Sequence, residues 1–290
     1  MVRLIAAIFA LCIFPLLLPA ALNAASRHDS IQELKVHFID VGQGDSILVE
    51  APNGRKMLVD GGPPSAAEKV TAYLREKGIE SLDLVVATHP DIDHIGGLVQ
   101  VLREFNVKHL IDSGKLYTTT TYFHYLHQIQ KQKIPVTIAA GEENIVIDPK
   151  LTVRVLNTQN AFKTNNQSSI ALSLKYGQID FLLMADVETN QEQKILDAKQ
   201  LEAEILKVAH HGSGTSTSFD FIREVRPETA ILSYSKDNAF GHPVDRVIDY
   251  LQLVGATIYS TAKTGDIVIR TDGKTYQVDI SGKDRVLIKP

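Results

Sequence analysis

A ten-residue stretch at positions 88–97, THPDIDHIGG, constrains this chain more than any other part of its sequence. It contains His89, Asp91, Asp93 and His94, four side chains that can bind metal ions, within six residues. The apolar run 84–87 before it predicts a buried strand, and the apolar spacing from 98 to 105 predicts a helix. Ligand-type side chains on a strand-to-helix loop indicate a divalent-metal site, and the alternative is a polar loop with solvated charges.

Acids and histidines follow three further predicted strands. Asp60 ends one strand, where it either forms a simple turn or orients a metal-bound histidine. Asp186 ends another, either as the N-cap of a helix from residue 189 or as a metal ligand. His210 and His211 end a third strand, and adjacent histidines at a strand end rarely arise as core packing.

The first 25 residues differ in kind from the rest of the chain. Arg3 is their only charge, the run 4–18 is almost wholly apolar, and small residues follow from Ala20 to Ala25. This pattern predicts a secretory signal peptide over residues 1–25 and a secreted or extracytoplasmic protein. An uncleaved N-terminal anchor is the alternative, although Pro15 and Pro19 leave the apolar run shorter than the about 20 residues of a spanning helix.

The single cysteine, Cys12, falls inside this predicted signal. Removal of the signal leaves a chain without thiols, which excludes disulfides and zinc held by cysteine, so any metal must be bound by His, Asp, Glu or Asn. The formal net charge is −4 and no long basic block appears, so charge alone does not predict tight binding of nucleic acid. We also expect no stable membrane embedding after signal cleavage, and the sequence indicates no protein partner.

Strands and helices alternate along the rest of the chain, which predicts a layered α/β architecture. No linker of low complexity divides it, so residues 34–282 are predicted to form one domain. In each of its two β-rich halves, acids and histidines lie at the ends of predicted strands.

These residues, taken in order, resemble the metallo-β-lactamase fold superfamily: Asp60-Gly61-Gly62, the loop from His89 to His94, the strand-end Asp186 and a later strand-end histidine. Further motifs resemble the extracytoplasmic metallo-β-lactamase-like domain of the competence protein ComEC, without its membrane channel: DVGQGD at 40–45, THPDxDHIGG at 88–97, HHGS at 210–213 and GHP at 241–243. The resemblance implies an αββα sandwich, two β-sheets flanked by helices, with two divalent metal ions, Zn or Mn, at one edge.

The resemblance also implies two ligand sets. The first consists of His89, Asp91 and a shared Asp186, with Asn165 or Asn166 as a further ligand. The second consists of Asp93, His94, Asp186 and His210, with His210 favoured over His211. Two departures from the family pattern stand out, because Asp91 replaces a common histidine and no histidine falls between residues 157 and 173.

The function implied is that of a secreted metal-dependent hydrolase, a phosphodiesterase or nuclease in which a metal-bridging hydroxide attacks phosphorus. His242, or whichever of His210 and His211 is not a ligand, would donate to the departing oxygen, and Asp60 would support catalysis by orienting a histidine. The substrate would be a phosphodiester, possibly DNA. The alternatives are a phosphodiesterase of a cell-wall polymer, similar to phosphorylcholine esterases, and a polymer-binding module without catalysis.

Overall fold

The computed structural model describes residues 32–141, 143–157, 163–198, 201–281 and 283–288. The predicted signal peptide at 1–25 lies outside these residues. The chain from residue 31 onward forms one compact unit. Within the described part of the chain, no helix combines the length and the apolar character needed to cross a bilayer.

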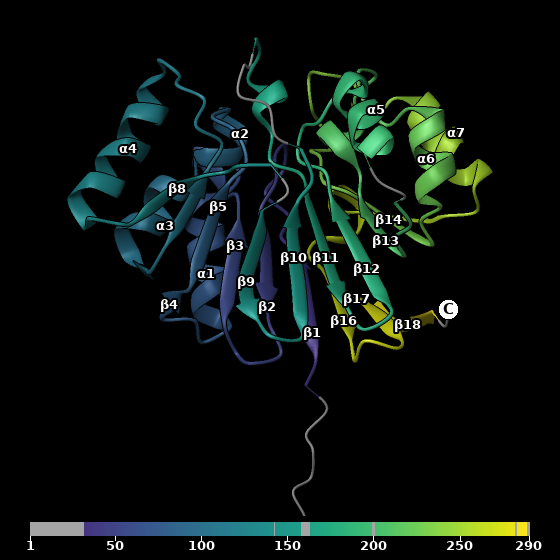
Figure 1. The fold of residues 1–290 in the computed structure, drawn as a ribbon, viewed down its shortest axis with the longest axis horizontal. Helices are drawn as coiled ribbons and strands as arrows, with labels where there is room; N and C mark the ends of the chain where they lie inside the picture. Colours follow the sequence, from purple (N-terminus) through teal and green to yellow (C-terminus); the bar gives the residue numbers. More distant parts are fainter. Residues whose placement is uncertain (1–31, 142, 158–162, 199–200, 282, 289–290) are drawn as a thin grey trace, which may run out of the picture. The chain divides into compact units, whose positions relative to one another are not determined.

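Two large sheets make up the centre of this unit (Figure 1). The first has the strand order β18 (Lys283–Ile288), β17 (Tyr276–Ile280), β16 (Ile267–Thr271), β1 (Leu34–Phe38), β2 (Ile47–Glu50), β3 (Lys56–Val59), β5 (Leu84–Ala87), β7 (Leu110–Asp112) and β8 (Val136–Ile138). The second has the order β15 (Thr257–Ser260), β14 (Thr229–Leu232), β13 (Ile205–Lys207), β12 (Ile179–Leu183), β11 (Leu172–Tyr176), β10 (Leu151–Val155) and β9 (Asn144–Asp148). A short pair, β4 (Ser81–Leu82) and β6 (Asn106–Val107), is separate from both.

Helices cover the outer face of each sheet. The first sheet packs against α1 (Ala67–Glu76), α3 (Leu98–Glu104) and α4 (Thr120–Gln132), and the short α2 (Ile92–Ile95) leads into α3. The second packs against α5 (Thr189–Ala198), α6 (Phe219–Val225) and α7 (Asp245–Leu253), with α8 (Thr261–Thr264) after β15. Between the sheets lies a third apolar cluster that draws side chains from both, such as Phe38 and Phe181. The predicted αββα sandwich is therefore confirmed.

The direction of the strands determines where functional side chains gather. In the first sheet β3, β5 and β7 run parallel to one another, and in the second β12, β13 and β14 do so. Ligands in α/β proteins bind outside the carboxyl ends of such strands. Asp60 follows β3, the 88–94 loop follows β5, Asp186 follows β12, and the two histidines follow β13.

Glu50 ties the first three strands of the chain to α1. Its carboxylate accepts from His37 Nε2 at 2.9 Å and pairs with Lys56 Nζ at 2.6 Å, while His37 Nδ1 accepts from the Tyr73 hydroxyl at 2.8 Å. The hydrogen bond from His37 and the pairing with Lys56 outweigh burial and lower the pKa of Glu50 to about 2. The charged form of Glu50 therefore stabilises the fold.

We expect Glu50→Gln to lower the free energy of unfolding by about 1–2 kcal/mol at pH 7, a value discounted for partial exposure. The contribution is complete above the ordinary carboxyl pKa near 4.5 and is lost as pH falls towards 2, so the variant and the parent converge in acid. Urea titrations at several pH values measure this, with the exposed Glu76→Gln as control. A deficit that stays constant down to pH 3 would contradict the assigned cause.

Candidate metal centre

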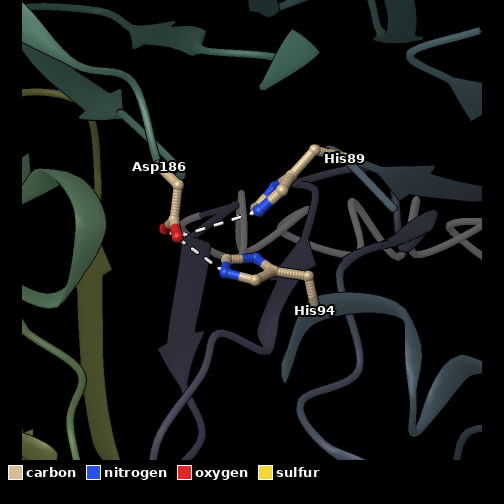
Figure 2. A group of neighbouring side chains, drawn as sticks. All are labelled: His89, His94 and Asp186. Carbon is tan, nitrogen blue, oxygen red and sulfur yellow. Dashed lines mark ion pairs between the residues drawn. The ribbon is translucent and has the colours of Figure 1, made fainter. Parts of the chain in front are cut away.

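Asp186 lies at the centre of the candidate site. Its buried carboxylate points two oxygens at two different sets of imidazoles. Oδ1 lies 3.3 Å from His94 Nε2 and 3.5 Å from His211 Nε2. Oδ2 lies 3.7 Å from His89 Nε2 and 3.5 Å from His210 Nε2. Figure 2 shows the rings of His89 and His94 directed at this carboxylate. Asp186 lies three residues before Thr189, where α5 begins, so it does not occupy the N-cap position of that helix.

The first set gathers around Oδ2 of Asp186. Asp91 Oδ2 lies 3.5 Å from His89 Nε2, so this acid lies directly beside His89 in the first set. Asn165 donates from Nδ2 to Asp91 Oδ1, whereas Asn166 donates to Glu188 at 3.3 Å. The sequence predicted Asn165 or Asn166 as a further ligand. Of these two, Asn165 contacts the first set, through its hydrogen bond to Asp91.

The second set gathers around Oδ1 of Asp186. His211 Nε2 lies 3.4 Å from Asp93 Oδ2, and the rings of His94 and His211 are 5.4 Å apart. Ligand atoms of Asp93, His94 and His211 all lie within 4.8 Å of one another, as do those of His89, His94 and Asp186. These distances suit two ligand sets that share one carboxylate.

The geometry favours His211 beside Asp93 and His94, whereas the sequence analysis favoured His210, and which of the two binds metal stays a prediction. His211 is the buried ring beside Asp93 and His94, while the His210 side chain is 20 % exposed and lies beside the other oxygen of Asp186. Both residues have a left-handed backbone, with φ of 47° and 56°, so the alternation of the preceding strand does not continue into them. Strand periodicity therefore gave no guide to which ring turns inward.

A chain of hydrogen bonds fixes which ring nitrogen faces the centre. His94 Nδ1 donates to Asp60 Oδ2 at 2.8 Å, and the Thr88 hydroxyl donates to the same oxygen at 2.7 Å. Because its proton is used there, the Thr88 hydroxyl accepts from His89 Nδ1 at 3.0 Å. His211 Nδ1 donates to the carbonyl of Ser233 at 2.9 Å. All three rings thus carry hydrogen on Nδ1 and turn Nε2 towards the centre.

Asp45 and Lys207 form a buried ion pair beside the second set. The sequence analysis assigned neither residue to the site. Lys207 Nζ lies 2.8 Å from Asp45 Oδ2, and neither side chain is more than 2 % exposed. The other oxygen of Asp45 belongs to a group with Asp186 and His211 whose ligand atoms lie within 4.8 Å of one another. A lysine inside the otherwise apolar strand β13 is the signal that could have revealed this pair.

His242 lies on the more open side of the cluster. Its ring centroid is 5.6 Å from that of His210, at an interplanar angle of 74°. Burial, together with the nearby His210 and His211, lowers the pKa of His242. The lowered pKa favours the neutral form of the ring.

The electrostatics of the cluster depend on its carboxylates. Burial opposes the charged imidazole of His94, but Asp186 and Asp60 outweigh this and raise the pKa of His94 well above its usual value. Burial likewise opposes the charge of Asp186, yet His211 and His94 outweigh it and hold the pKa of Asp186 well below the usual carboxyl range. The centre therefore presents charged carboxylates, the form that binds cations.

Close backbone contacts hold the ligand loops together. A Cβ on Gly44 would come 2.1 Å from the carbonyl oxygen of Asp93, and one on Gly97 would come 1.9 Å from that of Gly61. The loop after His211 is fixed by Arg246, whose guanidinium donates to the carbonyls of residues 214, 216 and 217 at 2.8–3.2 Å. The site is therefore built from rigid segments.

Unsatisfied atoms show what this cluster can hold. Among the described residues, Nε2 of His89, His94 and His211 and Oδ1 of Asp186 are buried without a hydrogen-bond partner, although they lie within ion-pair range of one another. Buried polar atoms without partners are costly, and imidazole nitrogen with carboxylate oxygen is a common donor set for divalent first-row metals. The residues present therefore fit divalent metal ions.

A family model for the metallo-β-lactamase superfamily matches residues 39–236. The chain belongs to this superfamily. Among curated proteins, it is 32% identical over 257 residues to ComE operon protein 3 of Bacillus subtilis, covering 82% of this chain and 33% of that protein. It is 30% identical over 241 residues to recombination protein 2 of Haemophilus influenzae, covering 80% and 28%. The chain thus spans about a third of the length of these relatives.

Solved structures support the superfamily fold. CmlA, a diiron β-hydroxylase from Streptomyces venezuelae, has a TM-score of 0.57 at 14% identity over 83% of this chain and 54% of its own. Igni18, a metallohydrolase from Ignicoccus hospitalis, has a TM-score of 0.52 at 17% identity over 81% of this chain and 98% of its own. At this identity the likeness concerns the fold alone.

We expect Asp186→Ala to lose all tightly bound divalent metal, because both ligand sets share its carboxylate. His211→Ala should lose the metal of the second set, whereas His210→Ala should retain it. Metal analysis after dialysis measures the content, with Asp197→Ala, an exposed acid on α5, as control. Retention of the second metal in His211→Ala together with its loss in His210→Ala would restore the order inferred from sequence.

Proposed function

We propose that this superfamily member is an extracytoplasmic, metal-dependent phosphodiesterase that cleaves nucleic acid. The observation that carries the proposal is the carboxylate of Asp186, whose two oxygens each face two imidazole nitrogens. Asp186 and the imidazoles around it would hold divalent ions, which would supply a water of lowered pKa and neutralise charge on a phosphodiester.

The protein's own contribution is preorganisation. Asp60, Thr88 and the Ser233 carbonyl hold the hydrogen-bearing nitrogens of three rings, so Nε2 already faces the centre before any ion arrives. Such outer hydrogen bonds fix the tautomer and strengthen metal binding. Asp60 therefore acts through His94 and Thr88 and has no direct contact with substrate in this account.

His242 is the group proposed to act on the substrate. It stands next to His210, outside the two ligand sets, and its buried Nδ1 has no hydrogen-bond partner among the described residues. A neutral imidazole there can donate a hydrogen bond to the oxygen that departs from phosphorus. The residue is thus placed to help the leaving group without binding metal.

The donor set supports both Zn and Mn as the natural metal. Three imidazoles suit zinc, while the carboxylates Asp91, Asp93 and Asp186 make the set harder and also suit manganese. The nucleic-acid substrate is supported by the names of the relatives, which concern competence and recombination. The extracytoplasmic location is supported by the predicted signal peptide and by the position of the only cysteine within it.

The purified protein should cleave single-stranded DNA in the presence of Mn²⁺ or Zn²⁺ and stop when EDTA removes the metal. His242→Ala should keep its metal and slow cleavage by about a hundredfold, the usual scale for a missing acid or base group. Gel assays with metal analysis on the same samples measure both, and His124→Ala, an exposed histidine on α4, is the control.

Other results would change the proposal. Metal loss in His242→Ala would make His242 a ligand, and unchanged turnover would assign the hydrogen bond to the departing oxygen to His210 or to water. Hydrolysis of bis-p-nitrophenyl phosphate without DNA cleavage would favour a cell-wall polymer, and inactivity on both despite bound metal would favour a binding module.

A further inference from the structure

Phe240 is an exposed aromatic side chain next to the proposed active site. It is 68% exposed, although a phenyl ring of this size is usually buried. Its ring stacks on His242, with the centroids 5.5 Å apart and an interplanar angle of 23°. One face of Phe240 thus contacts the residue proposed to act on the substrate, and much of the ring remains open to solvent.

The loop that carries Phe240 is held by Asn238. The side-chain oxygen of Asn238 accepts from the backbone N–H of Phe240 at 3.1 Å and from that of His242 at 3.0 Å. Its amide nitrogen donates to the carbonyls of Ser235 and His242, both at 2.7 Å. These four hydrogen bonds hold the backbone of the loop that carries the aromatic ring.

A row of rings connects Phe240 to the centre. His210 lies 3.5 Å from Asp186 Oδ2, the ring of His242 lies 5.6 Å from that of His210, and Phe240 stacks on His242. Phe240 is therefore the outermost member of a row that begins at the shared carboxylate. A diester held at the centre would place a neighbouring unit of its polymer at this outer ring.

The aromatic side chain of Phe240 indicates which kind of polymer unit can bind beside the diester. Nucleobases stack on a single exposed aromatic side chain irrespective of sequence, because every base has a π-face. Quaternary ammonium groups such as choline are bound instead by cages of several aromatic rings. Among the described residues, His242 is the ring in contact with Phe240, so the arrangement is a flat platform and not a cage.

We propose that Phe240 is a stacking platform for an unpaired nucleobase next to the diester that is cleaved. The inference rests on the proposed function for the position of the diester and adds single-stranded nucleic acid as the preferred form. Lys236 and Asp237 carry opposite charges, so these two residues add no net positive charge that would bind phosphates.

Equilibrium binding tests the platform without cleavage. Two labelled probes of equal length, oligothymidylate and an abasic deoxyribose-phosphate oligomer, both with cleavage-resistant phosphorothioate linkages, are titrated with the metal-loaded protein by fluorescence anisotropy. The parent should bind oligothymidylate about tenfold or more tightly than the abasic probe. Phe240→Ala and Phe240→Leu should lose this preference and Phe240→Trp should retain it. Phe123→Ala, which removes a phenyl 56% exposed on α4, should match the parent.

The outcomes test the stacking platform independently of the proposed nuclease activity. A preference that survives in Phe240→Ala, equal binding of both probes by the parent, or no binding of either would overturn the platform even if DNA cleavage occurs. A Phe240-dependent preference without metal-dependent cleavage would support the platform and overturn the proposed nuclease. Competition by phosphorylcholine at Phe240, with no base preference, would overturn it in favour of a choline-bearing polymer.

Discussion

The buried carboxylate of Asp60 is the interaction on which the site depends. It accepts from the Thr88 backbone at 2.9 Å, from the Thr88 hydroxyl and from His94, and so joins the end of β3 to the loop after β5. Asp60 itself has a left-handed backbone with φ of 59°, an unfavourable conformation for a residue other than glycine. The surrounding hydrogen bonds hold this conformation, and the same bonds set the tautomers of His89 and His94.

The cluster is unfavourable without cations, and this links folding to function. Carboxylates and imidazoles are buried together at the edge shared by two sheets, and several of their atoms have no hydrogen-bond partner. Buried charges without full compensation are costly. A ligand that binds only the folded state stabilises it by mass action, so divalent metal should also stabilise the fold.

Much of the fold and the main ligand loop could be predicted from sequence. The loop from His89 to His94 carries its ligands in one short segment between a strand and a helix, so its meaning does not depend on distant contacts. Asp60 and Asp186 were found for the same reason, since both directly follow an apolar strand. Their roles as ligands and orienting groups stay predictions.

The rest depends on tertiary contacts. The choice between His210 and His211 follows from two left-handed residues in succession, which no side-chain pattern predicts. The pair of Asp45 and Lys207 joins segments 162 residues apart, so the unusual lysine in β13 marks a buried charge but does not identify its partner. The contact of Asn165 with Asp91 arises in the same way, because separate loops meet only after both sheets have packed.

The most direct test of the central claim is a crystal structure of the metal-loaded protein with anomalous scattering recorded at the absorption edge of the metal. The account predicts two anomalous peaks, one beside each oxygen of Asp186, with Nε2 of His89 facing the first and Nε2 of His94 and His211 facing the second. A single peak, ligation through Nδ1, or His210 in the place of His211 would contradict it.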